Sequence, residues 1–437
     1  MSTDSATQAE RQVMVTKVAV SSFLGTFIEW FDYASYSYLA TVIALVFFAN
    51  GDSSGLIMTF AVFAISFVAR PIGAFVWGSL GDKKGRKWTL SVSILMMSGA
   101  TFLIGCLPTY AMVGFLAPVL LLLCRIVQGF SAAGEYAGAA TFLSEYAPKE
   151  KRGLYCSLVP ASTSVGLLVG SGLIALMYFM LPEADLMAWG WRVPFLLAGP
   201  LGFVARYIRT KLEDSPTYQA MQDAMTAQPG ETLHPVRDLF QKHFKKLAIS
   251  FGACVLNAVG FYAVLTYLPT YLTDAVGMDA GPATVATNIS LVVYVLFIFA
   301  SGWISDHFGR KKMLITACVA FIVLTIPAFM LLNTGNFIVV LGVELVLCLI
   351  LTINDGTLSC YLTETFPTEV RYTGFALSFN LANALFGGTA SLICTALISA
   401  TGNTLAPAFY LIVISAFALV AMILSHEHSD KDLDEIE

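Results

Sequence analysis

Twelve long apolar segments limit what this chain can fold into. Each is about 20 residues or longer, which is the length that an α-helix needs to cross the hydrocarbon core of a bilayer. Strands of a membrane barrel alternate apolar and polar residues over about ten positions, and these segments are far longer than that. The sequence therefore predicts an all-α membrane protein with twelve transmembrane helices. The expected spans are 17–48, 54–80, 88–107, 112–145, 153–181, 191–209, 245–272, 282–304, 312–333, 336–364, 372–399 and 404–425.

The charged residues support the same class and set an orientation. They make up only 12% of the 437 residues, whereas soluble domains contain about 25%. Lys and Arg are abundant in the loops at 81–87, 149–152, 206–246 and 306–312, and they are absent from the loops on the other side. Because cytoplasmic loops of membrane proteins are enriched in Lys and Arg, we expect both termini in the cytoplasm.

One long polar connection divides the spans into two groups of six. We expect a cytoplasmic N-terminal segment, a six-helix bundle, a cytoplasmic loop between the bundles, a second six-helix bundle and an acidic cytoplasmic tail. Their expected bounds are 1–16, 17–210, 211–244, 245–425 and 426–437.

The two halves share a pair of loop motifs. The first motif consists of Gly78, Asp82, Gly85 and Arg86, and it recurs in the second half as Gly302, Asp306, Gly309 and Arg310. The second motif, Glu145–Pro148–Arg152 after the fourth span, recurs as Glu364–Pro367–Arg371 after the tenth. Repeats at corresponding loops indicate two bundles related by duplication.

These motifs carry a family resemblance. The G-x-x-x-D-x-x-G-R and E-x-x-P-x-x-x-R loops resemble the signature loops of the major facilitator superfamily. The stretches "EWFDY", "ARPIGA", "QGFSAAGEYAGAATFLSEYAP", "WGWRVPF" and "FNLANALFGG" resemble its metabolite:proton symporter family. Within that family, "GEYAGA", "SEYAP" and "TYLPTYL" most resemble the proline/betaine branch, whereas Arg125 and "NALFGG" are shared with carboxylate carriers. The resemblance implies the twelve-helix major facilitator fold, with the first, fourth, seventh and tenth spans around a central cavity, in the plasma (inner) membrane of a bacterium.

The repeated loops are candidates for a charged gate. Asp82 and Arg86 lie four residues apart and share one helical turn, and a glycine lets neighbouring helices approach closely. Pairs at the cytoplasmic edge can hold one state closed and separate in another. The alternative is that Lys and Arg only keep these loops inside the cell. The gating candidates are Gly78, Asp82, Arg86, Glu145, Arg152, Asp306, Arg310, Glu364 and Arg371. In the first half Arg152 and Glu145 are expected as the opposite-charge partners of Asp82 and Arg86, and in the second half Arg371 and Glu364 are expected as those of Asp306 and Arg310.

Charges inside the spans are costly and mark candidate functional sites. The first span contains Glu29 and Asp32, and the fourth contains Arg125 and Glu135, and all four are candidates for proton coupling. Asp32 and Arg125 are expected at similar depth, so the carboxylate can alternate between pairing with Arg125 and binding a proton. The resemblance to proton-coupled sugar porters supports this role, and a static ion pair between two helices is the alternative. Arg70, before a proline in the second span, is expected to end a helical turn and anchor a neighbour.

Further polar and aromatic residues are candidates for binding a substrate. Phe261 and Tyr262 can surround a quaternary ammonium group through cation–π contacts, whereas Tyr267 and Tyr271 are expected in the aromatic belt at the membrane interface. Asp355 is either a second proton site or a polar contact, and the asparagines of the eleventh span can equally join helices. The candidates are Tyr36, Arg125, Gln128, Asn257, Phe261, Tyr262, Asn354, Asp355, Asn380 and Asn383.

Several classes of function are excluded by missing motifs. No phosphate-binding loop of an ATP-driven pump is present, and no nucleophile–base pair of an enzyme lies in the spans, so we expect no catalytic residues. No metal site and no cofactor are expected, nor is a nucleic-acid partner, and we expect a monomer in the lipid bilayer.

The expected function is proton-driven import of a zwitterionic osmolyte such as proline or glycine betaine. The carboxylates around the buried arginines favour a zwitterion over an anion. The alternatives are a proton symporter of an organic acid such as α-ketoglutarate or citrate, and a transporter-like sensor.

Overall fold

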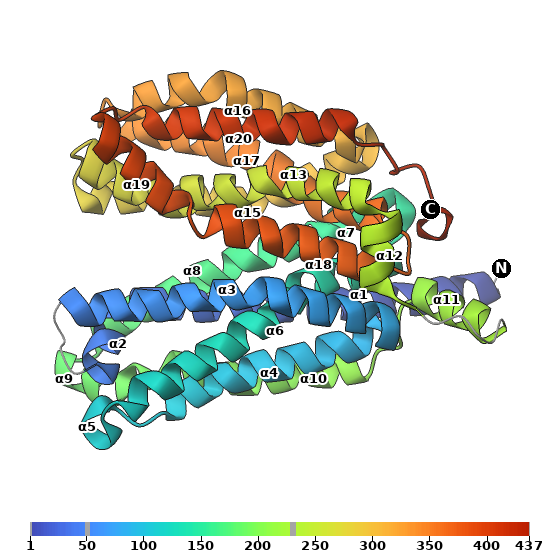
Figure 1. Ribbon diagram of the computed structural model, residues 1–437, viewed down its shortest axis with the longest axis horizontal. Helices are drawn as coiled ribbons and strands as arrows, with labels where there is room; N and C mark the ends of the chain where they lie inside the picture. The colour runs from blue at the N-terminus through green and yellow to red at the C-terminus, as the bar shows by residue number, and fades with distance from the viewer. Residues whose placement is uncertain (1, 49–52, 228–232, 437) are drawn as a thin grey trace. The chain divides into compact units, whose positions relative to one another are not determined.

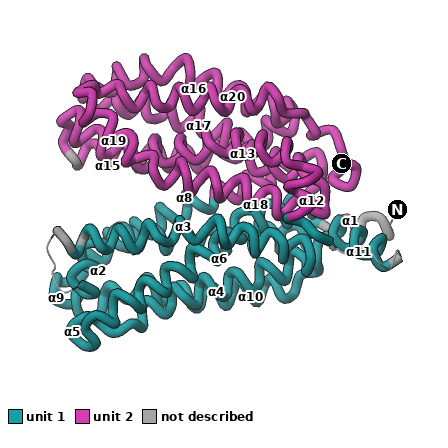
Figure 2. The backbone as a smooth tube through the Cα atoms, in the orientation of Figure 1, with its two compact units in different colours: residues 1–146, 162–236 teal, residues 147–161, 237–437 magenta. Residues whose placement is uncertain are grey.

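The structure is a computed structural model that describes residues 2–48, 53–227 and 233–436, and within these ranges the chain is helical with no β-strand. The chain forms two compact units (Figure 2). Unit 1 contains Met1–Tyr146 and Ser162–Val236, and unit 2 contains Ala147–Ala161 and Arg237–Glu437. Residues 147–161, which follow the fourth expected span, group with unit 2. Within the expected connection 211–244, residues 228–232 lie outside the described residues.

Unit 1 is built from long helices joined by short turns (Figure 1). Its elements are α1 (Ser2–Tyr38), α2 (Ala40–Phe47), α3 (Ser53–Lys84), α4 (Arg86–Cys106), α5 (Tyr110–Val113), α6 (Leu116–Tyr146), most of α8 (Leu158–Met180), α9 (Glu183–Asp185), the π-helix η2 (Leu186–Gly190), α10 (Arg192–Thr210) and α11 (Pro216–Ala227). Helix α12 (Pro235–Lys242) begins at the end of unit 1 and continues into unit 2.

Unit 2 contains several π-helical turns within its spans. Its elements are the 3₁₀ turn η1 (Lys149–Lys151), α7 (Arg152–Cys156), α13 (Phe244–Gly260), the π-helix η3 (Phe261–Tyr267), α14 (Leu268–Thr270), the π-helix η4 (Tyr271–Ala275), α15 (Ala280–Phe308), α16 (Arg310–Leu332), α17 (Phe337–Thr365), α18 (Arg371–Ala382), the π-helix η5 (Asn383–Gly387), α19 (Ala390–Thr401), α20 (Ala406–Leu424) and the 3₁₀ turn η6 (Leu433–Glu435).

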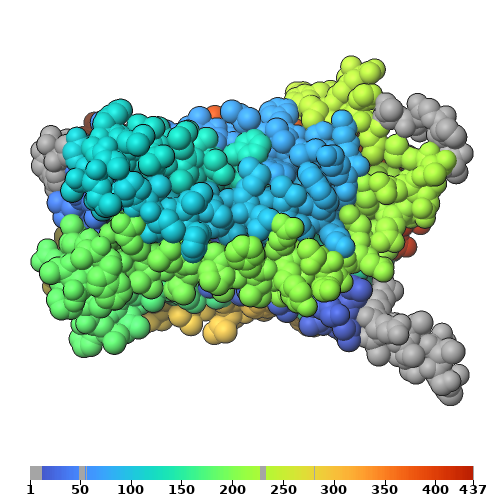
Figure 3. Space-filling model, turned by 90° about the horizontal axis from the view of Figure 1, so that it is seen from below, coloured from blue at the N-terminus to red at the C-terminus, as the bar shows by residue number. Residues whose placement is uncertain are grey.

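Eleven helical stretches among the described residues are long and apolar enough to cross a membrane. Eleven of the twelve expected spans correspond to these stretches. The sixth expected span is α10, which is less apolar because it contains Arg192, Arg206 and Arg209. Figure 3 shows the face of unit 1 formed by α4, α6 and α10. Its exposed apolar side chains include Phe102, Leu103, Leu123, Leu197 and Phe203, as expected where helices contact lipid chains.

The backbone conformation explains why the second position of glycine in the repeated loop motif, Gly85 or Gly309, is glycine. Gly85 separates α3 from α4 with φ +99°, and Gly309 separates α15 from α16 with φ +89°. Side chains with a Cβ atom avoid this region of backbone conformation. A Cβ atom on Gly85 would also lie 1.9 Å from Oδ2 of Asp214, and one on Gly309 would lie 2.7 Å from Oε2 of Glu427. Both turns therefore require glycine.

The interior of unit 1 contains a polar layer between two apolar clusters. Ile28, Met97 and Ala132 belong to one cluster, from α1, α4 and α6. Tyr36, Ile104 and Leu121, from the same three helices, belong to the other. On each helix the residues between the two clusters include polar side chains. That layer consists of Asp32 on α1, Thr101 on α4, and Arg125 and Gln128 on α6, all of them buried.

Candidate functional site

Asp32 and Arg125 form a buried ion pair at the centre of the polar layer. Arg125 donates through Nη1 to Oδ2 of Asp32 at 2.6 Å and to Oε1 of Gln128 at 3.0 Å. Gln128 in turn donates through Nε2 to the hydroxyl of Thr101 at 2.6 Å. The chain of contacts joins α1, α6 and α4. The structure thus brings together Asp32, Arg125 and Gln128, as the sequence predicts.

Tyr36 positions the Arg125 guanidinium by stacking. The Cζ atom of Arg125 lies 3.6 Å from the centre of the Tyr36 ring. The Tyr36 hydroxyl donates to the backbone oxygen of Thr59 at 3.0 Å, and the ring stacks on Phe63 with a centroid distance of 5.7 Å. These contacts hold the Tyr36 ring in place against the guanidinium. We expected Tyr36 to contact a substrate, and in the structure its direct contact is with Arg125.

Glu29 belongs to a second buried ion pair in the same unit. Arg70 donates through Nη2 to Oε1 of Glu29 at 2.5 Å and to the hydroxyl of Tyr33 at 2.7 Å. Its Cζ atom also lies 4.9 Å from the centre of the Phe67 ring. Helix α3 continues through Pro71, so the expectation that Arg70 ends a helical turn is wrong. Arg70 does anchor a neighbouring helix, because it joins α3 to α1.

Glu135 lies in a separate network that is fully hydrogen-bonded. Both of its carboxylate oxygens accept hydrogen bonds from Arg209 of α10. Arg209 also donates to the backbone oxygen of Leu90 at 2.6 Å and to the hydroxyl and backbone oxygens of Ser21 at 3.0 and 3.2 Å. One arginine therefore joins α1, α4, α6 and α10. This geometry favours a structural role for Glu135 over proton binding.

A polar cluster in unit 2 surrounds Asp355. Asn257 of α13 donates to Oδ1 of Asp355 at 2.6 Å, and Tyr294 of α15 donates to Oδ2 at 2.5 Å. Glu344, also on α17, accepts from Thr287 and Ser290 at 3.1 and 3.3 Å. Within the described residues neither carboxyl group has an ion-pair partner. The structure thus brings together Asn257 and Asp355, two of the residues predicted to bind a substrate.

The remaining candidates of unit 2 lie on α17, on α18 and in the π-helical turns η3 and η5. The rings of Phe261 and Tyr262 meet edge to face with a centroid distance of 5.6 Å. A Cβ atom on Gly387 of η5 would lie 2.8 Å from the Tyr262 ring, so η3 and η5 approach closely. Three asparagines complete the set of candidates. Asn354 is buried beside Asp355, and the side chains of Asn380 and Asn383 donate to backbone oxygens of their own helix at 2.8 and 3.0 Å.

The two tyrosines expected in the membrane-interface belt are not on the surface. Tyr271 is fully buried, and its hydroxyl donates to the side chain of Asn333 and the backbone oxygen of Thr404. Tyr267 is also buried, and it accepts a hydrogen bond from Thr395 at 3.3 Å. Both side chains belong to the interior of unit 2, so the belt interpretation is wrong for them.

The gating candidates of unit 1 form one buried charged cluster. Arg86 donates to both carboxylate oxygens of Glu145 at 3.1 and 3.2 Å and lies 3.3 Å from Asp82. Asp214, after α10, accepts from the backbone N–H groups of Arg86 and Lys87 at the start of α4, at 3.0 and 3.3 Å. Burial raises the pKa of Asp214, and the nearby Arg86 opposes that shift. Gly78 lies in α3, one turn before Asp82.

Unit 2 repeats this cluster around Glu364. Arg310 donates to both carboxylate oxygens of Glu364 at 3.1 and 3.2 Å and lies 2.9 Å from Asp306. Glu427, after α20, accepts from the backbone N–H groups of Arg310 and Lys311 at 3.2 and 2.8 Å. In each half, the acidic residue that binds the N-terminus of the third transmembrane helix (α4 or α16) therefore comes from the segment after the sixth transmembrane helix (α10 or α20).

Arg152 joins the unit 2 cluster, which the sequence did not predict. Its Nη1 atom donates to Oε1 of Glu364 at 2.9 Å. The backbone N–H groups of Gly153 and Leu154 donate to the two carboxylate oxygens of Asp306 at 2.7 and 3.0 Å. The expectation that Arg152 pairs with Asp82 is wrong, because the ion-pair partner of Arg152 is Glu364. These contacts hold residues 147–161 against α15 and α17.

Arg371 ties the end of α17 to the C-terminal segment. We expected it to pair with Asp306, whose ion-pair partner is Arg310. The Arg371 guanidinium donates to the backbone oxygens of Thr363 and Phe366 at 2.9 and 3.1 Å, and to that of Leu433 at 2.7 Å.

This arrangement of paired, membrane-embedded charges and duplicated charged loops has known counterparts. The family model for the Major Facilitator Superfamily matches residues 22–391. The chain belongs to the major facilitator superfamily. It is a multi-pass membrane protein with the helical architecture that this family implies.

Relatives place this family member in a narrower branch. It is 34% identical to a proline/betaine transporter of Salmonella typhimurium, over 95% of this chain and 84% of the relative. It is 38% identical to a putative proline/betaine transporter of Staphylococcus haemolyticus, over 94% and 87%. The resemblance to the proline/betaine branch is thereby confirmed.

A solved structure supports the fold. A structure of the proton:xylose symporter XylE superposes with a TM-score of 0.78 at 18% identity, and the match covers 97% of this chain and 98% of that one. At this identity the likeness concerns the fold alone.

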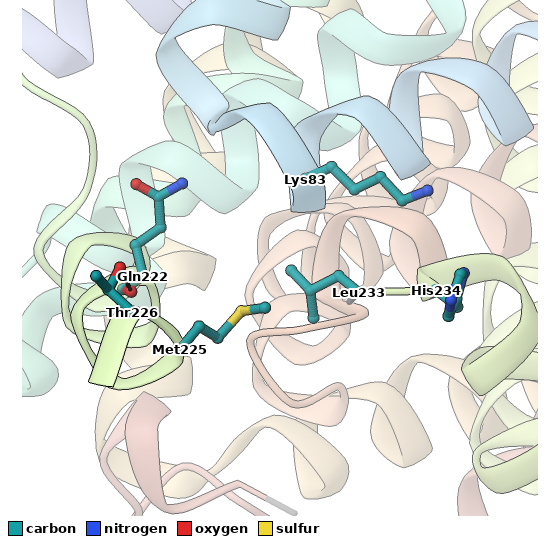
Figure 4. Close-up of a pocket in the computed structure, with 6 residues that line it drawn as sticks. All are labelled: Lys83, Gln222, Met225, Thr226, Leu233 and His234. Carbon is teal, nitrogen blue, oxygen red and sulfur yellow. Dashed lines mark hydrogen bonds between the residues drawn. The ribbon is translucent and has the colours of Figure 1, made fainter. Parts of the chain in front are cut away.

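One larger hollow in unit 1 lies away from these residues. It has a volume of about 620 Å³ and lies between the end of α3 and the segment around α11 (Figure 4). Its lining is Lys83, Gln222, Met225, Thr226, Leu233 and His234, which includes none of the candidate residues.

Proposed function

We propose that this protein is a proton-coupled symporter that imports a small zwitterionic osmolyte, such as proline or glycine betaine, by alternating access. The names of its relatives support the substrate class, since they extend over almost the whole chain. The observation that carries the proton-coupling role is the buried pair of Asp32 and Arg125, with 2.6 Å between Oδ2 and Nη1.

Asp32 has the properties that a proton carrier needs. Its side chain is 3% exposed, and removal of one partner from a buried ion pair costs about 3–5 kcal/mol. A movement of α6 relative to α1 that separates the two groups therefore favours the neutral, protonated carboxyl. Re-formation of the pair releases the proton. Asp32 thus exchanges its proton as the pair opens and closes.

The charge of the polar region favours a neutral ligand. Glu29 and Asp32 are paired with Arg70 and Arg125, so the two positive and two negative charges cancel. While Asp32 is ionised, a zwitterion adds no net charge to such a region, whereas an organic acid leaves an unbalanced negative charge at low dielectric. α-Ketoglutarate and citrate remain the second class of substrate to test.

The charged loops serve as the gate in this proposal. Arg152 and the N–H groups of Gly153 and Leu154 bind Glu364 and Asp306 of unit 2, although the chain continues from this segment into α8. A conformational change that draws the segment away must break these contacts. We further propose that the protein works as a monomer in the inner membrane of a bacterium, with cytoplasmic termini, and that the proton gradient replaces any cofactor.

Transport by purified protein in liposomes tests the function. Labelled glycine betaine or proline should accumulate when the outside is made acidic, and Asp32→Asn should abolish accumulation while counterflow without a gradient remains. Asp223→Asn, on the exposed surface of α11, is the matched control. Binding without uptake would indicate a sensor, and accumulation by Asp32→Asn would place the proton site elsewhere.

A further inference from the structure

We propose that the open edge of Arg125 binds the carboxylate of the substrate, so that substrate and Asp32 share one guanidinium. This inference rests on the proposed function and specifies which group of the substrate the site recognises. It also explains how substrate and proton can bind cooperatively.

Arg125 has donors that the described structure does not use. Its side chain is fully buried, and Nη1 alone makes the contacts with Asp32 and Gln128. The Nε and Nη2 groups are buried without a hydrogen-bond partner. A buried donor without an acceptor is costly, so an acceptor that reaches this position is strongly favoured.

The two unused groups form a recognition element together. In a guanidinium the Nε–H and one Nη2–H point in parallel along the same edge, and this edge binds a carboxylate through two hydrogen bonds. The Cζ atom of Arg125 lies 3.6 Å from the centre of the Tyr36 ring, so this ring holds the guanidinium from one side. The geometry therefore suits a planar carboxylate that lies in the guanidinium plane.

Unsatisfied acceptors lie in the same region. Oδ1 of Asp32 and Oε2 of Glu29 are buried and have no hydrogen-bond partner. Both residues line a narrow gap, too small to hold a water molecule, together with Tyr33, Met97, Gln128 and Ala132. The region thus offers open donors on Arg125 for the carboxylate of a zwitterion, and the open carboxylate oxygen of Glu29 lies nearby on the same side as a negative charge for its cationic end. The gap is smaller than such a ligand, so binding requires the helices to separate.

The groups around Asp32 identify Arg125 as the shared cation. On α6, Asp32 faces Arg125 and Cys124, and on α1 it lies near Glu29, Tyr33 and Tyr36. Helix α4 adds the neutral hydroxyl of Thr101. Helix α3 contributes Arg70, which is paired with Glu29. Arg125 is thus the cation in direct contact with Asp32.

Sharing one cation couples the two ligands. A substrate carboxylate on Nε and Nη2 offsets the positive charge that holds Asp32 ionised, so Asp32 takes up a proton more readily. By linkage, protonation of Asp32 strengthens substrate binding by the same factor. Substrate binding should therefore take up about one proton per molecule.

Isothermal titration calorimetry of the purified full chain tests this coupling. Glycine betaine is titrated in two buffers of equal pH and different ionisation enthalpy, and the difference in heat gives the protons taken up. At a pH at which Asp32 is ionised, we expect the wild type to take up about one proton for each glycine betaine bound. Asp32→Asn should still bind glycine betaine but take up no proton. Choline, which has the same cationic group and no carboxylate, should bind far more weakly than glycine betaine.

Substitutions of Arg125 complete the experiment. Arg125→Lys keeps the charge but lacks the two-pronged edge, and we expect its affinity for glycine betaine to fall roughly 10- to 100-fold and its preference over choline to disappear. Arg125→Gln should behave alike, and Arg237→Gln on α12 is the control.

Each result bears on one of two ideas. Binding of glycine betaine without proton uptake, or unchanged preference over choline in Arg125→Lys, would overturn the shared guanidinium and leave the symporter proposal standing. Binding of citrate or α-ketoglutarate with no binding of either zwitterion would overturn both.

Discussion

The network of Glu135 and Arg209 predicts a large effect on stability. Replacement of Arg209 by Met leaves the fully buried Glu135 without its ion-pair partner and removes donors from the oxygens of Leu90 and Ser21. Loss of one partner of a buried pair costs about 3–5 kcal/mol. Four helices of unit 1 depend on this arginine, so we expect unit 1 to lose stability as a whole.

The assay is thermal unfolding of the purified protein in detergent. For a unit of this size the cost corresponds to a fall in unfolding temperature on the order of 10 °C. Arg206→Met is the matched control, because Arg206 lies on the same helix and is exposed. The double variant with Glu135→Leu should recover most of the loss, since apolar residues often replace a buried pair without cost.

A specific pattern would refute this structural role. If Arg209→Met leaves the unfolding temperature unchanged, and Glu135→Gln abolishes accumulation of substrate but not counterflow, then Glu135 is a proton-binding group. The same measurements thus decide between the two interpretations of Glu135.

Three further predictions concern the gate, the turns and unit 2. Asp82→Asn should slow transport and leave substrate affinity unchanged, because Asp82 contacts Arg86 in the charged cluster; wild-type uptake rates would contradict the gating role. Gly85→Ala should destabilise unit 1 by about 1–3 kcal/mol through backbone strain alone, whereas Gly99→Ala, where a Cβ atom meets nothing within 4 Å, should be neutral in the same unfolding assay. Asp355→Asn should cost about 1 kcal/mol by weakening one of two hydrogen bonds and leave the ratio of protons to substrate unchanged in flux measurements; a lower ratio would mark a second proton site.

Hydropathy and loop charge predicted the fold because membrane insertion acts on local sequence. A span of apolar residues is recognisable by itself, so eleven of the twelve expected helices satisfy a simple criterion. Helix α10 does not, because Arg209 serves a buried network and lowers the apolar content of its own helix. The need for an internal partner outweighed local hydropathy at that position.

The partners of the buried charges were harder to predict than the charges themselves. Asp32 and Arg125 could be matched by depth, but the pairing of Glu29 with Arg70 depends on which faces of α1 and α3 meet. No local pattern encodes that contact. Asp214 and Glu427 did leave a signal, since each follows the last span of its half, and extension of the repeat search beyond the loops would have found them.

The double pairing of Glu364 determines how easily its contact with Arg152 can break. When Arg152 withdraws, Glu364 keeps Arg310 on both oxygens, and Asp306 keeps the same arginine at 2.9 Å. No carboxylate is left buried without a cation, so release avoids the penalty that an isolated buried charge would impose. The contact is therefore suited to repeated opening, because Glu364 and Asp306 remain paired with Arg310 whether or not Arg152 is bound.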